Sequence, residues 1–111
     1  MKLKGKVHDN VYVVSLSGKI MGGPEIGEIH TAVKSSLEKN MKQIVIDLRD
    51  VGWMGSMGIG ILICCLTTVR NAGGELKLSG LTDKVIKILE ITKLDQVFET
   101  HPEVDVAVAS F

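Results

Sequence analysis

The sequence is poor in the residues that mark several special classes of protein. It contains 2 cysteines, 2 prolines, 3 histidines and only 4% aromatic residues. Cys64 and Cys65 are adjacent, and a disulfide between neighbours would strain the backbone, so we expect both to be reduced residues of the core. No His/Cys spacing matches a zinc site. The sequence therefore predicts neither a disulfide scaffold nor a metal site, and it implies no cofactor.

The sequence has no excess of positive or of negative charge. The chain has 13 Lys+Arg and 13 Asp+Glu, which gives a formal net charge of +0. Nucleic-acid binding needs basic side chains clustered against the phosphates, and no basic run occurs. We therefore do not expect direct nucleic-acid binding.

No hydrophobic run is long enough for a membrane span. The most apolar stretch, residues 51–66, is shorter than the about 18 residues that a spanning helix needs, and we assign it to the core. The charged N-terminus passes into an alternating pattern without the apolar stretch or cleavage site of a signal peptide. The sequence thus predicts a cytoplasmic protein without membrane insertion.

The residues that are present suit one globular domain over residues 1–111. Hydrophobic residues make up 45% and charged residues 23% of the chain, which is too apolar for a disordered protein. Strands at residues 3–7 and 10–17, the second ending at Gly18, predict a hairpin with its turn at residues 8–10. Apolar residues then recur at spacings of three and four from Pro24 to Met41, a pattern typical of an amphipathic helix.

Strands and helices alternate along the rest of the chain. The apolar run at residues 43–48 predicts a central strand, and the apolar segment through Val69 predicts a buried helix that stops at residues 71–74. A strand at 75–79, a helix at 82–91, a short apolar piece at 96–98 and a helix after Pro102 follow. These elements predict an α/β sandwich with a mixed, partly parallel β-sheet of four to five strands and about four helices.

The junction of the central strand and the apolar helix, residues 49–58, is the candidate functional segment. A helix start presents unpaired N–H groups and the positive end of the helix dipole, which favour a hydroxyl or a phosphate. Ser56 is the hydroxyl there, either as a capping residue or as a modification site. A nucleophile elbow and a P-loop do not fit, because Met54 and Ile61 stand where these motifs need glycine and lysine.

Two acidic residues lie close to this segment. Asp47 and Asp50 are oxygen ligands that a hard cation prefers, but no third ligand lies near them in the sequence. We expect Asp47 to stabilise the turn and Asp50 to be solvated.

Residues 44–62 resemble the signature of STAS domains of the bacterial anti-sigma factor antagonist family. The segment is Ile-Val-Ile-Asp-Leu-Arg-Asp-Val-Gly-Trp-Met-Gly-Ser-Met-Gly-Ile-Gly-Ile-Leu. Residues 16–20 are similar to the family's first landmark, and residues 71–76 are similar to its helix-to-strand turn. The resemblance therefore covers nearly the whole chain, and it implies a STAS-like sandwich that regulates by partner switching and is not an enzyme.

The resemblance also implies a phosphorylation switch at Ser56. In the family, an anti-sigma factor that is also a serine kinase phosphorylates this serine, and the unphosphorylated protein binds that partner and frees the sigma factor. The sequence diverges at three positions: Gly55 replaces an Asp, Met57 replaces a Ser or Thr, and Met21 replaces an acidic residue. The alternatives are a scaffold subunit of a signalling or lipid-transport assembly that is not phosphorylated, and a sensor of anions or nucleotides.

Large apolar residues gather on the same two loops: Met21, Trp53, Met54 and Met57. Methionine and tryptophan are frequent at binding surfaces, so these residues predict a surface for a protein partner, with lids over the core as the alternative. Gly55 and Gly58 are expected to let the backbone approach the partner or a phosphate.

Overall fold

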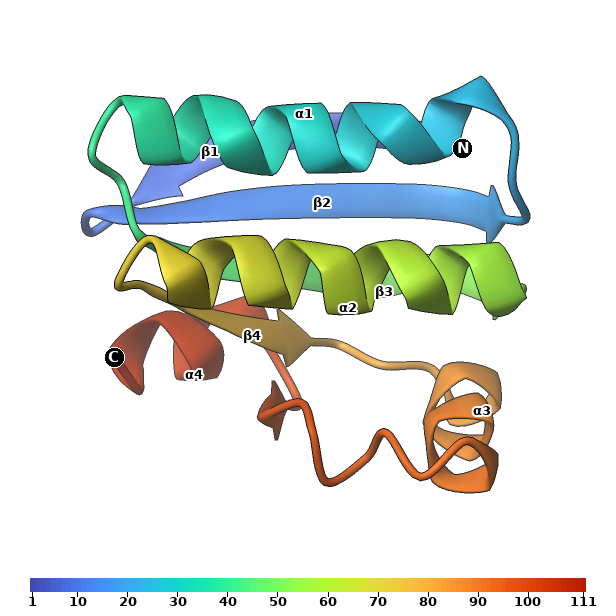
Figure 1. The fold of residues 1–111 in the computed structure, drawn as a ribbon. Helices are drawn as coiled ribbons and strands as arrows, with labels where there is room; N and C mark the ends of the chain where they lie inside the picture. Colours follow the sequence, from blue (N-terminus) through green and yellow to red (C-terminus); the bar gives the residue numbers. More distant parts are fainter.

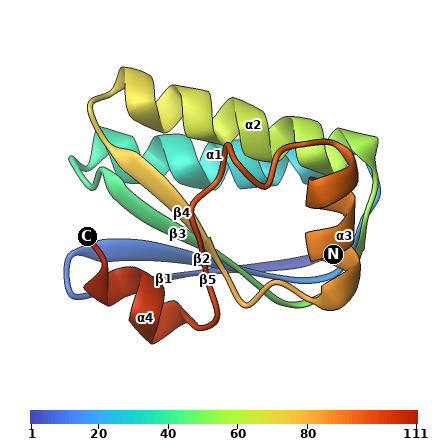
Figure 2. The ribbon, with the colours of Figure 1, turned by 90° about the horizontal axis from the view of Figure 1, so that it is seen from below.

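The chain forms one five-stranded sheet with helices on both faces (Figures 1 and 2). The computed structural model describes residues 1–111. The strands are β1 Lys2–His8, β2 Val11–Ile20, β3 Gln43–Met54, β4 Glu75–Ser79 and β5 Thr100–His101, and they lie in the order β1-β2-β3-β4-β5. β1 and β2 are antiparallel, whereas all other neighbours are parallel. The predicted mixed, partly parallel sheet is confirmed.

The N-terminal hairpin turns through Asp9 and Asn10. Their φ angles are 51° and 66°, as a two-residue type I′ turn requires, so the predicted hairpin is confirmed. The second strand runs to Ile20 and does not end at Gly18. Gly18 takes a φ of +94° at a register shift, and this bulge lets β2 continue beside β3.

The central strand is also longer than the sequence predicts. β3 continues beyond Leu48 to Met54, and its last residue pairs with Ile20 of β2. Beyond Leu48 only Val51 and Met54 of this strand are buried, and the other residues are exposed, so the apolar run ends there. Most of the predicted loop is therefore strand, and only Gly55 separates the end of β3 from Ser56.

Two long helices cover one face of the sheet (Figure 2). α1 is Pro24–Glu38 and α2 is Ser56–Asn71. α1 begins at the predicted proline, but it ends before Met41 because Asn40 adopts a left-handed φ of 62°. The main core fills the space between these helices and the sheet, and it includes Leu16, Ile29, Ile46 and Leu62.

Two shorter helices complete the fold. α3 is Asp83–Ile91 and lies at the end of the sheet, and α4 is Val104–Ala109 and lies on the face opposite α1 and α2 (Figure 2). Both helices confirm predictions from the sequence. α4 packs Ala107 and Val108 into a second, smaller core whose strand members are Val11, Val13 and Val45.

The expectation that residues 51–66 are all core is wrong. Cys65 is buried, and its burial raises the pKa of the thiol to about 12. Cys64 is exposed, as are Met57 and Ile63, because α2 presents one side to the sheet and the other to solvent. Both cysteines are free thiols. None of the helices combines the length and hydropathy that crossing a bilayer requires.

Candidate functional site

The candidate site lies where β2 and β3 end side by side. The amide of Gly55 donates a hydrogen bond of 2.8 Å to the carbonyl oxygen of Ile20, which joins the two strand ends just before α2 begins. The loop from β2 to α1 also reaches α2, because a Cβ on Gly22 would lie 3.0 Å from Sδ of Met57. The segment around Met21 and the segment at residues 49–58, which the sequence analysis singled out, are therefore neighbours in the structure.

Ser56 is the first residue of α2 and is exposed. The N-cap is Gly55, in an extended conformation, and no side chain caps the helix. The interpretation of Ser56 as the capping residue is therefore wrong, since β3 runs to Met54 and leaves Gly55 at the cap position. The first turn also carries no acidic residue. The positive end of the helix dipole thus faces solvent beside the Ser56 hydroxyl.

Three apolar side chains close to Ser56 in the chain or on the adjoining β2–α1 loop are exposed. Met21 is 56% exposed, Trp53 42% and Met57 59%; we call these three residues the apolar rim. Met54 is only 1% exposed and belongs to the core, so it offers no contact area to a partner. Strand alternation explains the difference, because Trp53 and Met54 are successive residues of β3 and point to opposite faces.

The two glycines of the predicted site have different surroundings. Gly58 is buried, and a Cβ there would lie 2.7 Å from Cγ2 of Ile20 and 2.8 Å from Cγ of Met54. Its small size therefore lets α2 pack on the strands, and it does not expose backbone to a partner. Gly55 is partly exposed, and a Cβ there would lie 3.4 Å from the carbonyl oxygen of Met21.

Of the two acidic side chains near the site, that of Asp47 is bonded within the sheet and that of Asp50 is not. Oδ1 of Asp47 accepts a 3.0 Å hydrogen bond from the amide of Arg49, and Oδ2 accepts a 3.3 Å hydrogen bond from the Ser15 hydroxyl. The turn expected at Asp47 is absent, because β3 continues to Met54, and these hydrogen bonds lie at a register shift within the strand. Asp50 is exposed. No group of three or more His, Cys, Asp or Glu side chains is placed to hold a metal ion.

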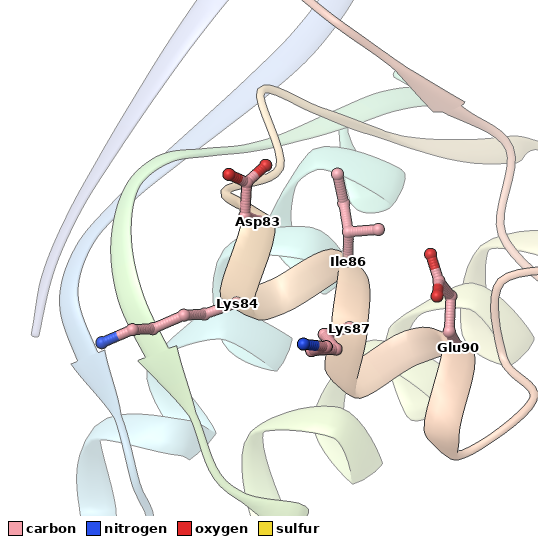
Figure 3. Close-up of a pocket in the computed structure, with 5 residues that line it drawn as sticks. All are labelled: Asp83, Lys84, Ile86, Lys87 and Glu90. Atoms are coloured by element: carbon pink, nitrogen blue, oxygen red, sulfur yellow. The ribbon is translucent and has the colours of Figure 1, made fainter.

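A surface hollow lies on α3 and does not include Ser56. It is lined by Asp83, Lys84, Ile86, Lys87 and Glu90, all of one helix. Figure 3 shows these side chains spreading apart from the helix. They do not converge on a common point as the polar groups of a ligand site do.

Sequence reasoning missed Gly22 as part of the site. Its contact with Met57 joins the β2–α1 loop to α2, and its φ is +154°. The signal was the pair Gly22-Gly23 before Pro24, which favours an irregular turn. The sequence alone does not say which other loop such a turn will touch.

The comparisons with known proteins agree with this arrangement. The STAS domain model matches residues 2–107. The anti-sigma-B factor antagonist of Bacillus subtilis is 35% identical over 54 residues, which cover 49% of this chain and 50% of the relative. In that match the chain spans about half the relative's length. The anti-sigma-B factor antagonist of Staphylococcus aureus is 23% identical over 108 residues, which cover 96% of this chain and 97% of the relative.

Solved structures share the whole fold. An anti-sigma factor antagonist from Mycobacterium paratuberculosis has a TM-score of 0.84 and 26% identity, covering 98% of this chain and 92% of that chain. The Bacillus cell fate determinant SpoIIAA in its phosphorylated form has a TM-score of 0.75 and 13% identity, covering 99% of this chain and all of its own. At 13% identity the second likeness concerns the fold alone. With the family model matching nearly every residue and the sheet and helices in the same arrangement, this chain belongs to the STAS domain family.

Proposed function

We propose that this protein is an anti-sigma factor antagonist. In this proposal it binds an anti-sigma factor that is also a serine kinase, and phosphorylation of Ser56 switches the binding off. Relatives named as anti-sigma-B factor antagonists support the class of partner. The role is regulatory, and a partner that controls sigma factors places it in the cytoplasm.

The observation that carries the proposal is that Ser56 is exposed at the start of α2 and that no side chain caps this helix. A kinase needs access to the acceptor hydroxyl, and this hydroxyl is not used as a helix cap. A phosphate adds about −1.5 to −2 charge, which the free N–H groups and the dipole of a helix start tolerate. Phosphorylation at this point is therefore compatible with the fold.

The apolar rim supplies the contact area of the proposed interface. Three residues are exposed: Met21 on the β2–α1 loop, Trp53 near the end of β3, and Met57 in the first turn of α2. A partner that covers these side chains also removes water from the serine. A phosphate placed within such a contact would oppose binding through desolvation and charge repulsion. This gives the modification a physical route to switch the complex.

Two residues beside the serine favour a second candidate, a scaffold that is not phosphorylated. Gly55 and Met57 replace the acid and the hydroxyl residue of the family signature. In this case the apolar rim still binds a partner, but Ser56 has no switching role. The two candidates therefore differ in what a charge at Ser56 does.

The first experiment is phosphopeptide mass spectrometry on the protein isolated from its own cells, both growing and stressed. We expect phosphate on the peptide that contains Ser56, with an occupancy that changes with growth condition. Complete coverage of this peptide without phosphate in any condition would exclude the switch.

The second experiment measures partner binding by Ser56 variants. Ser56→Ala is expected to bind the captured anti-sigma factor as the wild type does, and Ser56→Glu to bind about tenfold more weakly or worse, equivalent to about 1.4 kcal/mol. Ser35 is exposed in the last turn of α1, so Ser35→Glu controls for added charge. Equal binding by Ser56→Glu and Ser35→Glu would favour the scaffold.

A further inference from the structure

One long edge of the sheet has no partner strand. β1 is the first strand in the sheet order and pairs with β2 alone. It offers seven residues, Lys2–His8, whereas β5 at the opposite edge has two. An open edge presents free N–H and C=O groups to any chain that can lie beside it.

The hairpin geometry identifies the free backbone groups. The turn has two residues, so the flanking residues His8 and Val11 form a hydrogen-bonded pair, and such pairs alternate along the ladder. The amides and carbonyls of Leu3, Gly5 and Val7 therefore point away from β2. No backbone hydrogen bond outside the ladder uses these three residues.

The side chains of this edge alternate between cationic and apolar. Lys2, Lys4 and Lys6 are exposed on one face of β1, and α4 on that side of the sheet packs on β3, β4 and β5. Leu3 and Val7 lie on the other face, where Val7 is 57% exposed. The edge thus combines a row of positive charges with an incompletely covered apolar row.

We propose that β1 binds an extended acidic segment of another protein as an added strand. Backbone hydrogen bonds to Leu3, Gly5 and Val7 supply the pairing. Alternate acidic side chains of the segment face the three lysines, and its apolar side chains cover Val7. This surface is separate from the apolar rim, so the proposal does not depend on the switch at Ser56.

Charge decides against a second copy of this chain as the occupant. Antiparallel pairing of two β1 strands would bring the lysine rows of both copies onto the same face. Like charges on neighbouring strands are destabilising, whereas opposite charges stabilise the pairing. The same lysines that hinder self-pairing of this edge thus select an acidic strand.

The probe is a synthetic peptide of alternating glutamate and valine, matched to β1 in length, with a lysine–valine peptide as its counterpart. We expect the acidic peptide to bind, to shift the amide resonances of Leu3, Gly5 and Val7, and to slow their hydrogen exchange. Added salt should weaken this binding. Absence of binding by the acidic peptide, or equal binding by the lysine peptide, would overturn the proposal.

Matched variants locate the binding. Lys4→Glu should weaken it by about threefold or more, since it turns an attractive cross-strand pair into a repulsive one. Lys87→Glu on α3 changes the net charge equally and should have no effect. Val7→Pro removes an outward N–H without breaking the ladder and should also weaken binding. Equal losses with Lys4→Glu and Lys87→Glu would show non-specific attraction and contradict the proposal.

Two further measurements separate the other outcomes. Ser56→Glu should leave peptide binding unchanged, so failure of the switch and failure of this proposal are distinguishable. In sedimentation experiments, the free wild-type protein should not form a dimer that the substitution Val7→Pro dissociates. Such a dimer would mean that the edge is occupied by a second copy, contrary to the proposal.

Discussion

Gly58 and Gly60 lie two residues apart in α2 but have opposite surroundings. A Cβ at Gly58 would lie 3.0 Å or less from atoms of Ile20 and Met54, including the Ile20 carbonyl oxygen, whereas a Cβ at Gly60 would meet nothing within 4 Å. We expect Gly58→Ala to lower the free energy of unfolding by about 1–3 kcal/mol through overpacking. Gly60→Ala should raise it by about 0.5–1 kcal/mol, because alanine is the better helix former. Urea unfolding of both variants would test this, and a stabilised Gly58→Ala would contradict the packing role.

The residues around Ser56 show how much of the site could be predicted from the sequence. The sequence placed Ser56 at the junction of the central strand and the apolar helix, and the structure places it as the first residue of α2. The sequence did not separate Met54, which is buried, from Trp53, which is exposed. The alternation of faces assigns these residues correctly only if β3 extends to Met54, and the end of the apolar run at Leu48 concealed that extension.

At the scale of elements, local signals were sufficient for most of the fold. The Asp9-Asn10 turn, the start of α1 at Pro24 and the strand at Glu75–Ser79 follow from turn chemistry, capping and periodicity. β5 cannot be predicted in this way, because two residues are too few to show an alternation of apolar and polar side chains. Thr100–His101 is a strand only because β4 leaves an edge beside it, which is a property of the assembled sheet.

Thr82 joins two elements through one hydroxyl. As N-cap of α3, Oγ1 accepts a hydrogen bond from the amide of Val85, and it donates a 3.1 Å bond to the carbonyl oxygen of Val51 on β3. Thr82→Ala should lower the free energy of unfolding by about 1 kcal/mol, the usual effect of losing a cap. The control is Thr67→Ala on α2, where Oγ1 bonds only to the Ile63 carbonyl within the same helix. Equal unfolding midpoints for the two variants would contradict a structural role for the Thr82 cap.

Across the whole molecule, the second face of the sheet is held by a buried cation. Nζ of Lys77 donates to the carbonyl oxygen and hydroxyl of Ser110 at 3.0 and 2.7 Å, and lies 2.8 Å from Oε2 of Glu99. The same ammonium lies 4.3 Å from the centre of the Phe111 ring. The chain end that follows α4 is thereby attached to β4. Strand periodicity does not predict this attachment, because an isolated Lys on the outer face of a strand is expected in solvent.

Acid should loosen this attachment through Glu99. Hydrogen bonds from Lys77 and from His101 lower the pKa of the Glu99 carboxyl from 4.5 to about 2. Because the folded-state pKa lies below the unfolded one, the stabilisation is complete above pH 4.5 and is lost as the pH falls toward 2. The carboxylate is half-exposed, so solvent screening keeps the effect modest.

Thermal unfolding followed between pH 7 and pH 2 would isolate this contribution. Glu99→Gln should lower Tm at pH 7, where the wild-type carboxylate is charged, and the two curves should converge as the pH falls and the wild type also becomes neutral. Glu90→Gln on α3 changes the net charge equally and lies outside the Lys77 cluster, so its curve should stay parallel to that of the wild type. A Tm difference between wild type and Glu99→Gln that persists unchanged to pH 2 would mean that the carboxylate charge does not hold the chain end.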